Sequence, residues 1–123
     1  MKIIAYIASD NDAGKELEKA IEFIIPENRT EVFRSPQSLL KRISQPGNRP
    51  SIIVLMPADR QDFSELLKIR KQLIEFRVLL ILPDRDKDTV EKGHTFYPRF
   101  ISYIDEDFSA VSMVLTKMAR IYK

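Results

Sequence analysis

Five aspartates follow closely on apolar runs of the sequence, where the chain would leave a buried strand: Asp10, Asp12, Asp59, Asp84 and Asp105. Carboxylates gathered at one edge can hold a hard cation such as Mg²⁺, which proteins bind through one or two carboxylates and water. Aspartate at the start of a helix also accepts hydrogen bonds from unpaired backbone N–H groups and meets the positive end of the helix dipole. We favour capping for these acids. Asp10, Asp12 and Asp59 remain the candidates for a residual metal site.

Two acidic segments have the spacing of a capping box with aspartate as the cap, Asp62-x-x-Glu65 and Asp88-x-x-Glu91. The three glycines form no phosphate-binding motif, although Gly14 lies near a helix start that a phosphate could approach. His94 is the only histidine and cysteine is absent, so paired imidazoles and thiolate ligands are both excluded. We therefore predict no catalytic residue, no cofactor and no enzyme activity.

The composition indicates one ordinary globular domain over residues 1–123, with 44% hydrophobic and 31% charged residues. The formal charge of +2 is too balanced to indicate a nucleic-acid partner, which normally requires a concentrated basic face. The N-terminal apolar run is short and soon meets acidic residues, unlike a secretory signal, and no run is long enough to span a membrane. We expect a cytoplasmic protein without a membrane partner.

Apolar runs typical of buried strands alternate with helical periodicity along the whole chain. The predicted strands are 2–8, 30–35, 51–56, 78–83 and 99–104; the predicted helices are 12–25, a segment beginning at Pro36, 62–76, 86–93 and 106–122. This alternation predicts an α/β fold, a five-stranded parallel sheet covered on both faces. With right-handed crossovers, a three-layer doubly wound sheet of flavodoxin-like order 2-1-3-4-5 is preferred, and a Rossmann-like order is the competitor.

The length, the element order and the apolar strands resemble the receiver domain of bacterial two-component response regulators, over essentially the whole chain. The resemblance implies a domain that accepts a phosphoryl group from a histidine kinase on an aspartate at the end of strand three. In such domains an acidic pair after strand one binds Mg²⁺. A threonine or serine ends strand four, and a lysine followed by proline ends strand five.

Most of those positions hold other residue types in this chain. The acceptor position falls on Met56 or Pro57, the hydroxyl position on Leu82 or Pro83, the lysine position on Tyr103, and the acidic pair on Ile7 and Ala8 or, at best, Ser9 and Asp10. Phe100 alone fits, at the position of the aromatic switch residue. The chain therefore resembles degenerate members of the family, called pseudo-receivers, which act through protein contacts.

We accordingly expect a non-catalytic protein-interaction module in bacterial signalling, not phosphorylated at the usual position. The alternative is a small-ligand protein that binds a nucleotide or flavin in the crevice at the strand ends. Receiver-like domains commonly pair through the fourth helix, the fifth strand and the fifth helix, which predicts a homodimer or a foreign protein partner there. Aromatic residues and arginine in that region have the composition of an interface: Phe96, Tyr97, Arg99, Tyr103 and Tyr122.

Overall fold

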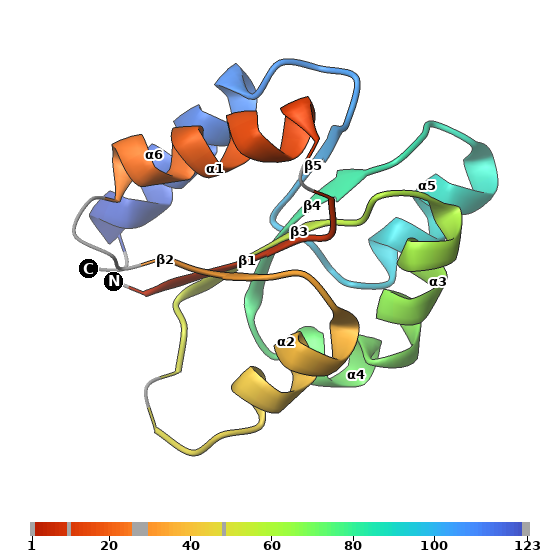
Figure 1. Cartoon of the computed structure of the whole chain (residues 1–123), viewed down its shortest axis with the longest axis horizontal. Helices are drawn as coiled ribbons and strands as arrows, with labels where there is room; N and C mark the ends of the chain where they lie inside the picture. The colour runs from red at the N-terminus through yellow and green to blue at the C-terminus, as the bar shows by residue number, and fades with distance from the viewer. Residues whose placement is uncertain (1, 10, 26–29, 48, 122–123) are drawn as a thin grey trace.

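Strands and helices alternate along the chain in a computed structural model, which describes residues 2–9, 11–25, 30–47 and 49–121 (Figure 1). The strands are β1 (Ile3–Ile7), β2 (Thr30–Phe33), β3 (Ile52–Met56), β4 (Arg77–Leu82) and β5 (Phe100–Tyr103). The helices are α1 (Asp12–Ile24), α2 (Pro36–Ile43), α3 (Arg60–Lys68), α4 (Arg70–Leu73), α5 (Lys87–His94) and α6 (Ser109–Ile121). Within the described residues, no helix has the length and apolar character needed to cross a bilayer.

The five strands form one parallel sheet in the order β2-β1-β3-β4-β5. This confirms the predicted fold class and the flavodoxin-like strand order over the Rossmann-like one. In Figure 1, α1 and α6 lie on one side of the sheet and α2 to α5 on the other. Because all strands run in one direction, every strand ends at the same edge, which we call the C-terminal edge; the opposite edge is the N-terminal edge.

Both faces of the central strands are buried, because alternate side chains of a strand point to opposite faces. In β1, for example, Ile3, Ala5 and Ile7 pack into the core beneath α1 and α6. Ile4 and Tyr6 pack into the second core, with side chains of α2, α3 and α4. All five residues of β1 and all of β3 are buried, which explains why these segments read as continuous apolar runs.

Two predicted helices have different limits in the structure. The predicted helix 62–76 begins two residues earlier, at Arg60, and is interrupted at Ile69, where it divides into α3 and α4. The last helix begins at Ser109 instead of residue 106, because the Asp107 side chain accepts a hydrogen bond from the Ser109 backbone N–H at 3.0 Å. Pro26, the predicted stop of the first helix, lies outside the described residues.

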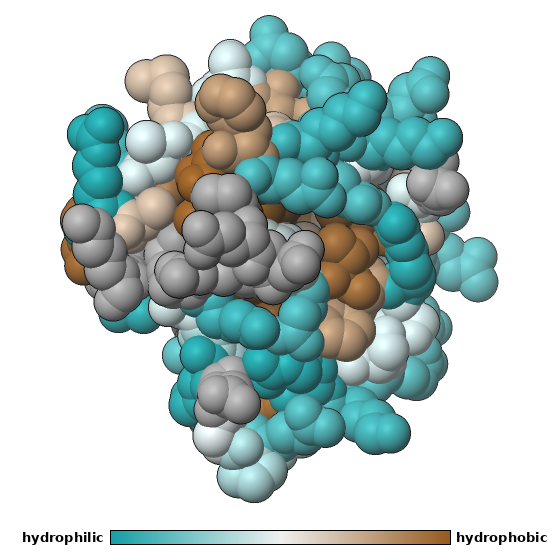
Figure 2. Space-filling view, turned by 60° about the vertical axis from the view of Figure 1, so that its left-hand side comes forward, coloured by the Kyte–Doolittle hydropathy of each residue, from teal (hydrophilic) through white to brown (hydrophobic). Residues whose placement is uncertain are grey.

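The surface beside α1 and α6 is largely polar. Phe23 of α1 and Met113 and Ile121 of α6 are exposed apolar side chains in this layer. Figure 2 is turned to bring the side with the α1 and α6 ends forward, and there apolar side chains interrupt a mostly hydrophilic surface. Isolated apolar side chains of this kind are normal on protein surfaces.

An ion-pair cluster links the edge strand β2 to its neighbours. Glu31 of β2 binds the Arg42 guanidinium of α2 at 3.1 Å and the Lys2 ammonium at 3.2 Å. The hydrogen bond from Arg42 is the main cause that holds the pKa of the Glu31 carboxyl below its usual 4.5, with Lys2 acting in the same direction. The charged form of Glu31 is therefore favoured in the folded state.

Removing the charge of Glu31 should weaken the pH dependence of stability. A carboxyl with a lowered folded pKa stabilises the fold above its unfolded pKa of about 4.5, and this contribution disappears as the pH falls through the folded pKa. Glu31→Gln should lose under about 1 kcal/mol at pH 7, because the pair is partly exposed. Its free energy of unfolding should then fall less steeply than that of the wild type from pH 5 to pH 3.

Chemical denaturation at several pH values measures this difference. Glu16→Gln is the matched control, since Glu16 is exposed on α1. Equal pH slopes for wild type and Glu31→Gln would contradict the stabilising role of the cluster.

Candidate functional site

The C-terminal edge of the sheet is where ligands bind in folds of this kind. At its centre β1 and β3 end side by side, with Ile7 paired to Met56. Met56 is 2% exposed and Pro57 is also buried. The thioether of Met56 and the ring of Pro57 carry no group that can accept a phosphoryl transfer.

The ends of β4 and β5 are also adjacent, with Leu82 paired to Tyr103. Leu82 is buried and Tyr103 is partly buried. Leu82 has no hydroxyl, and Tyr103 stands where the resemblance requires a lysine. The register therefore places the four positions predicted from the resemblance, Ile7, Met56, Leu82 and Tyr103, together at one edge.

Asp59 serves as the N-cap of α3. Its carboxylate accepts a hydrogen bond from the Asp62 backbone N–H at 2.8 Å. The predicted capping box is therefore wrong in register: Asp62 is the third residue of the helix, and its carboxylate accepts from the Ala58 backbone N–H at 2.9 Å. The second predicted box is wrong as well, because Asp88 lies inside α5 and pairs with Lys92 at 2.9 Å.

The other carboxylate oxygen of Asp62 accepts a hydrogen bond from the Tyr6 hydroxyl at 2.5 Å. Tyr6 has no exposed surface, and its hydroxyl links the end of β1 to the first turn of α3. Burial is the largest cause that raises the pKa of Tyr6 far above 10, followed by the bond to Asp62. Tyr6 is therefore a neutral donor over the whole physiological pH range, and it fixes the position of the segment that follows β3.

Arginines pair with carboxylates after three of the strands. After β2, Arg34 donates to the Ile7 carbonyl at 3.0 Å and pairs with Glu18 of α1 at 2.6 Å. Arg60, at the start of α3, pairs with Asp84 at 2.7 Å and also contacts Asp86. The bond from Arg60 is the main cause that lowers the pKa of Asp84, and the Thr89 hydroxyl contributes in the same direction.

Arg85, after β4, binds Asp105 at 2.5 Å and Glu106 at 3.2 Å. Its guanidinium lies 4.2 Å from the centre of the Tyr103 ring, a cation–π contact. The bond to Arg85 lowers the pKa of Asp105. Asp84 and Asp105 are thus favoured in the charged form, and each is paired with an arginine.

The metal candidates are not brought together in the described part of the chain. Asp59 is used as a cap, and Asp12 is an exposed residue in the first turn of α1, whose N-cap is Asn11. Asp10 lies outside the described residues. Among the residues that the structure describes, no group of three or more acidic or histidine side chains could hold a metal ion.

Gly14 is required by close packing. A Cβ at this position would lie 2.2 Å from the Ser9 carbonyl oxygen, so the tight turn between β1 and α1 admits only glycine. The Gly14 N–H donates to the Asn11 side chain at 2.8 Å. Close packing therefore explains why glycine occupies position 14, without a bound phosphate.

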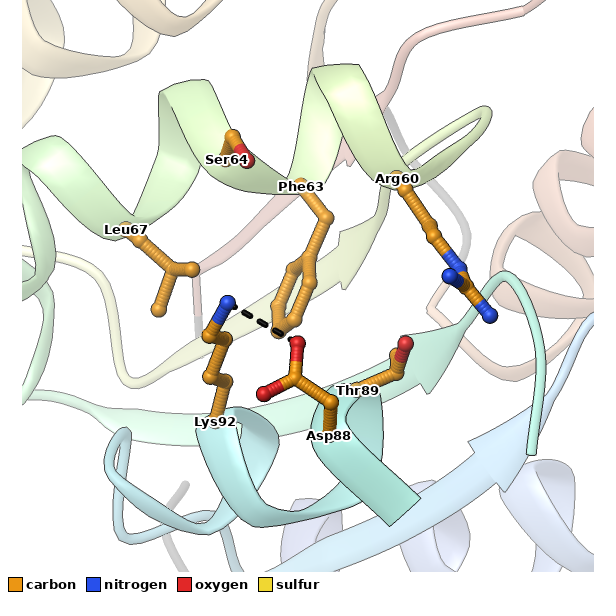
Figure 3. A pocket seen from close by; sticks show the side chains of 7 residues that line it. All are labelled: Arg60, Phe63, Ser64, Leu67, Asp88, Thr89 and Lys92. Atoms are coloured by element: carbon orange, nitrogen blue, oxygen red, sulfur yellow. Dashed lines mark ion pairs between the residues drawn. The ribbon is translucent and has the colours of Figure 1, made fainter. Parts of the chain in front are cut away.

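A small pocket lies between α3 and α5, on the face of the sheet that α2 to α5 cover (Figure 3). Phe63 and Leu67 form its apolar wall, and Arg60, Asp88 and Lys92 lie around it. Its volume is about 130 Å³, whereas sites for nucleotide-sized ligands usually measure about 300–1,000 Å³. This pocket is too small for a nucleotide or a flavin.

The predicted interface residues differ in exposure. Phe96 is wrong as an interface residue, because it has no exposed surface and packs against Phe63, with 5.9 Å between ring centres. Tyr97 is 76% exposed and Arg99 is exposed, both at the N-terminal edge before β5. Tyr103 is partly covered by Arg85 at the opposite edge. Tyr122 lies outside the described residues.

The sequence interpretation missed Tyr6, Arg34, Arg60 and Arg85. The three arginines share one signal, since each stands within four residues after a strand. The partners of Arg34 and Arg60 are 16 and 24 residues away, which no local pattern reveals. Tyr6 carried no signal, because an aromatic residue in an apolar strand is typical of core packing.

The strand order and the two covering layers are those of a flavodoxin-like doubly wound fold. A solved structure with this fold is the Mn²⁺-bound form of response regulator Rcp1, which superposes with a TM-score of 0.69. The match covers 99% of this chain and 94% of that chain at 13% sequence identity, so the similarity is one of fold. No protein-family model and no curated protein matches the sequence.

Removing the Tyr6 hydroxyl should destabilise the protein. Tyr6→Phe deletes a hydrogen bond to a charged carboxylate and keeps the ring, so we expect a loss of about 1.5–3 kcal/mol in the free energy of unfolding. Tyr97→Phe is the matched control, because that hydroxyl belongs to an exposed side chain and its removal should change stability by under about 0.5 kcal/mol. Urea denaturation of both variants tests the contrast, and equal effects would contradict the role given to Tyr6.

Proposed function

We propose that this chain is a receiver-like protein-interaction module in bacterial signalling that works without phosphorylation at the end of strand three. The observation that carries the proposal is the C-terminal edge itself. Met56 occupies the acceptor position, and the carboxylates after β4 and β5 form ion pairs with Arg60 and Arg85. Asp84 and Asp105 have little to offer to the Mg²⁺ that accompanies a phosphoryl group, because metal binding would first require breaking their pairs with Arg60 and Arg85.

Signalling through protein contacts is the role that remains for such a scaffold. The surface formed by α5, β5 and α6 is the proposed contact region for a protein partner. Tyr97 and Arg99 supply its exposed aromatic and cationic side chains, the residue types enriched at binding hot spots. The fold alone does not define a partner, so the assignment depends on these side chains.

Tyr97 has a backbone conformation that supports a binding role. Its φ of 50° lies in the left-handed region, which costs a residue with a side chain about 1–2 kcal/mol. Glycine would avoid that cost, and an exposed ring recovers little of it through packing. A tyrosine kept at a strained and exposed position is consistent with selection for contact with another molecule.

A beryllofluoride titration tests the absence of phosphoryl chemistry. Beryllofluoride with Mg²⁺ mimics an acyl phosphate on aspartate, and two-dimensional amide NMR follows the residues at the C-terminal edge. We expect no saturable shifts for Ala58 to Asp62 or for Asp84 to Asp86. A receiver domain with its acceptor aspartate intact, titrated in parallel, is the positive control. Saturable shifts around Asp59 or Asp84 would refute the non-phosphorylated role.

Replacing Tyr97 should show whether its ring stabilises the fold. Tyr97→Gly relieves the strained φ while adding backbone entropy to the unfolded chain, so stability should stay unchanged or rise by up to about 1 kcal/mol. Tyr97→Ala keeps the strain and should leave stability within about 0.5 kcal/mol of the wild type.

Thermal unfolding of the two variants measures this difference. A loss of more than about 1 kcal/mol in Tyr97→Gly would show that the ring stabilises the fold, and the strain would then give no support to a binding role.

A further inference from the structure

The two edges of the half-sheet formed by β3, β4 and β5 carry opposite charge. At the C-terminal edge, residues 57–62, 83–88 and 104–109 hold eight carboxylates and three cations, Arg60, Arg85 and Lys87. At the N-terminal edge, Arg49 and the segments 69–77 and 94–99 together hold five cations and one carboxylate, Glu75. We call these two surfaces the acidic edge and the basic edge.

Contacts in the structure bring the parts of the basic edge together. Arg70 of α4 donates to the Thr95 hydroxyl at 3.0 Å, which joins α4 to the segment after α5. The Arg99 backbone N–H donates to the Val78 carbonyl at 2.8 Å, which places Arg99 beside the start of β4. The Arg49 guanidinium lies 4.6 Å from the centre of the Phe76 ring. The cations thus surround the starts of β4 and β5.

Three of these cations have no carboxylate partner among the described residues: Arg70, Lys71 and Arg99. Glu75 approaches Arg49, and only at 4.0 Å. Tyr97 stands between His94 and Arg99 in the sequence and is 76% exposed. The basic edge therefore combines unpaired cations with one exposed aromatic ring.

Helix dipoles account for only part of this separation of charge. Acids favour helix N-termini and cations favour helix C-termini, and each terminus offsets about half a unit charge. Three helices, α3, α5 and α6, begin at the acidic edge, and α3, α4 and α5 end at the basic edge. Their dipoles are too weak to balance the excess charge on either edge.

The two edges cannot neutralise each other within one molecule. The strands between them contain four to six residues, which at about 3.3 Å per residue separates the edges by roughly 13–20 Å. That exceeds the screening length of about 8 Å at physiological ionic strength. Between two molecules the opposite edges can come into direct contact.

We propose that the basic edge binds the acidic edge of a second copy of this chain, in a head-to-tail arrangement. Arg70, Lys71 and Arg99 face the exposed acidic loop Asp105 to Asp107 of the other copy, where Arg85 offsets one of the three negative charges, and Tyr97 is the aromatic anchor. The proposal rests on the interaction role given to Tyr97 and Arg99 above and names their partner. Such an interface is heterologous, since each copy uses two different surfaces, and assembly therefore continues beyond a dimer unless the ring closes.

Charge reversal on one edge at a time tests this arrangement. The basic-edge variant is Arg70→Glu with Arg99→Glu, and the acidic-edge variant is Asp105→Lys with Glu106→Lys; all four side chains are exposed or partly exposed, so folding should be retained. The control is Lys19→Glu with Lys117→Glu, which changes the net charge as the basic-edge variant does but on α1 and α6, away from the basic edge. Amide NMR spectra confirm that each variant is folded.

Analytical ultracentrifugation then measures the average mass against concentration. The wild type and the control should self-associate at about 20 mM salt and dissociate at about 0.5 M salt, where the screening length falls to roughly 4 Å. Each edge variant alone should associate at least about tenfold more weakly. A mixture of the two edge variants should associate more tightly than either variant alone, because one variant retains the acidic edge and the other the basic edge.

Three results would overturn the proposal. They are a wild type that stays monomeric at low salt, a control that loses association equally, and edge variants that fail to combine in the mixture. If a single-stranded oligonucleotide bound the basic edge more tightly than a second copy of the protein does, the occupant of that edge would be a nucleic acid. None of these results bears on the beryllofluoride titration, so failure of the head-to-tail contact is distinguishable from failure of the proposed function.

Discussion

Burial of both faces of a parallel sheet is the constraint on which the rest of the structure depends. A polar side chain in strands such as β1 and β3 needs a hydrogen-bond partner at one of the two cores, as the Tyr6 hydroxyl finds in Asp62. Polar and charged residues are therefore displaced to the strand ends and the outer helix faces. Because the strands are parallel, all of them begin at one edge and end at the opposite edge. The polar and charged side chains at the strand ends are therefore grouped at these two edges.

At the C-terminal edge, charged side chains that follow the strands are engaged in structural pairs. Arg34, Arg60 and Arg85 come from three different connections, and each contacts an oxygen of another element. Exposed ion pairs contribute little stability one by one. Their common effect is to fix the loops after the strands and to hold the carboxylates in the charged form, as the lowered pKa values of Asp84 and Asp105 indicate. In the buried layer beneath, Tyr6 and Asp62 join β1 to α3 without any exposed cation.

The strands were predictable because they depend on local hydropathy, which the sequence carries. Their order was preferred but not fixed, since right-handed crossovers allow the Rossmann-like order as well. The break at Ile69 was not, since the apolar periodicity continues across it and only the backbone turn reveals it. The first helix cap was predicted three residues too late, at Asp62. Asp59 and Asp62 are both suitable N-caps; in the structure Asp59 is the cap, and Asp62 accepts a hydrogen bond from Tyr6. Phe96 was assigned to the surface for its residue type, whereas the α5–β5 connection turns its ring toward Phe63. Features that depend on contacts between distant segments are those that local patterns could not supply.

The same parallel geometry separates charge between the two edges. In the half-sheet of β3, β4 and β5, acidic residues gather where helices begin, and cations gather at the opposite edge. A molecule with this arrangement has one edge where carboxylates outnumber cations and one where the reverse holds, despite a formal net charge of only +2. The formal net charge is therefore a poor guide to what either edge can bind, because the distance between the edges exceeds the screening length in physiological salt. Tyr97 is exposed at the basic edge and has a strained backbone conformation, which is why the proposed contact is placed there.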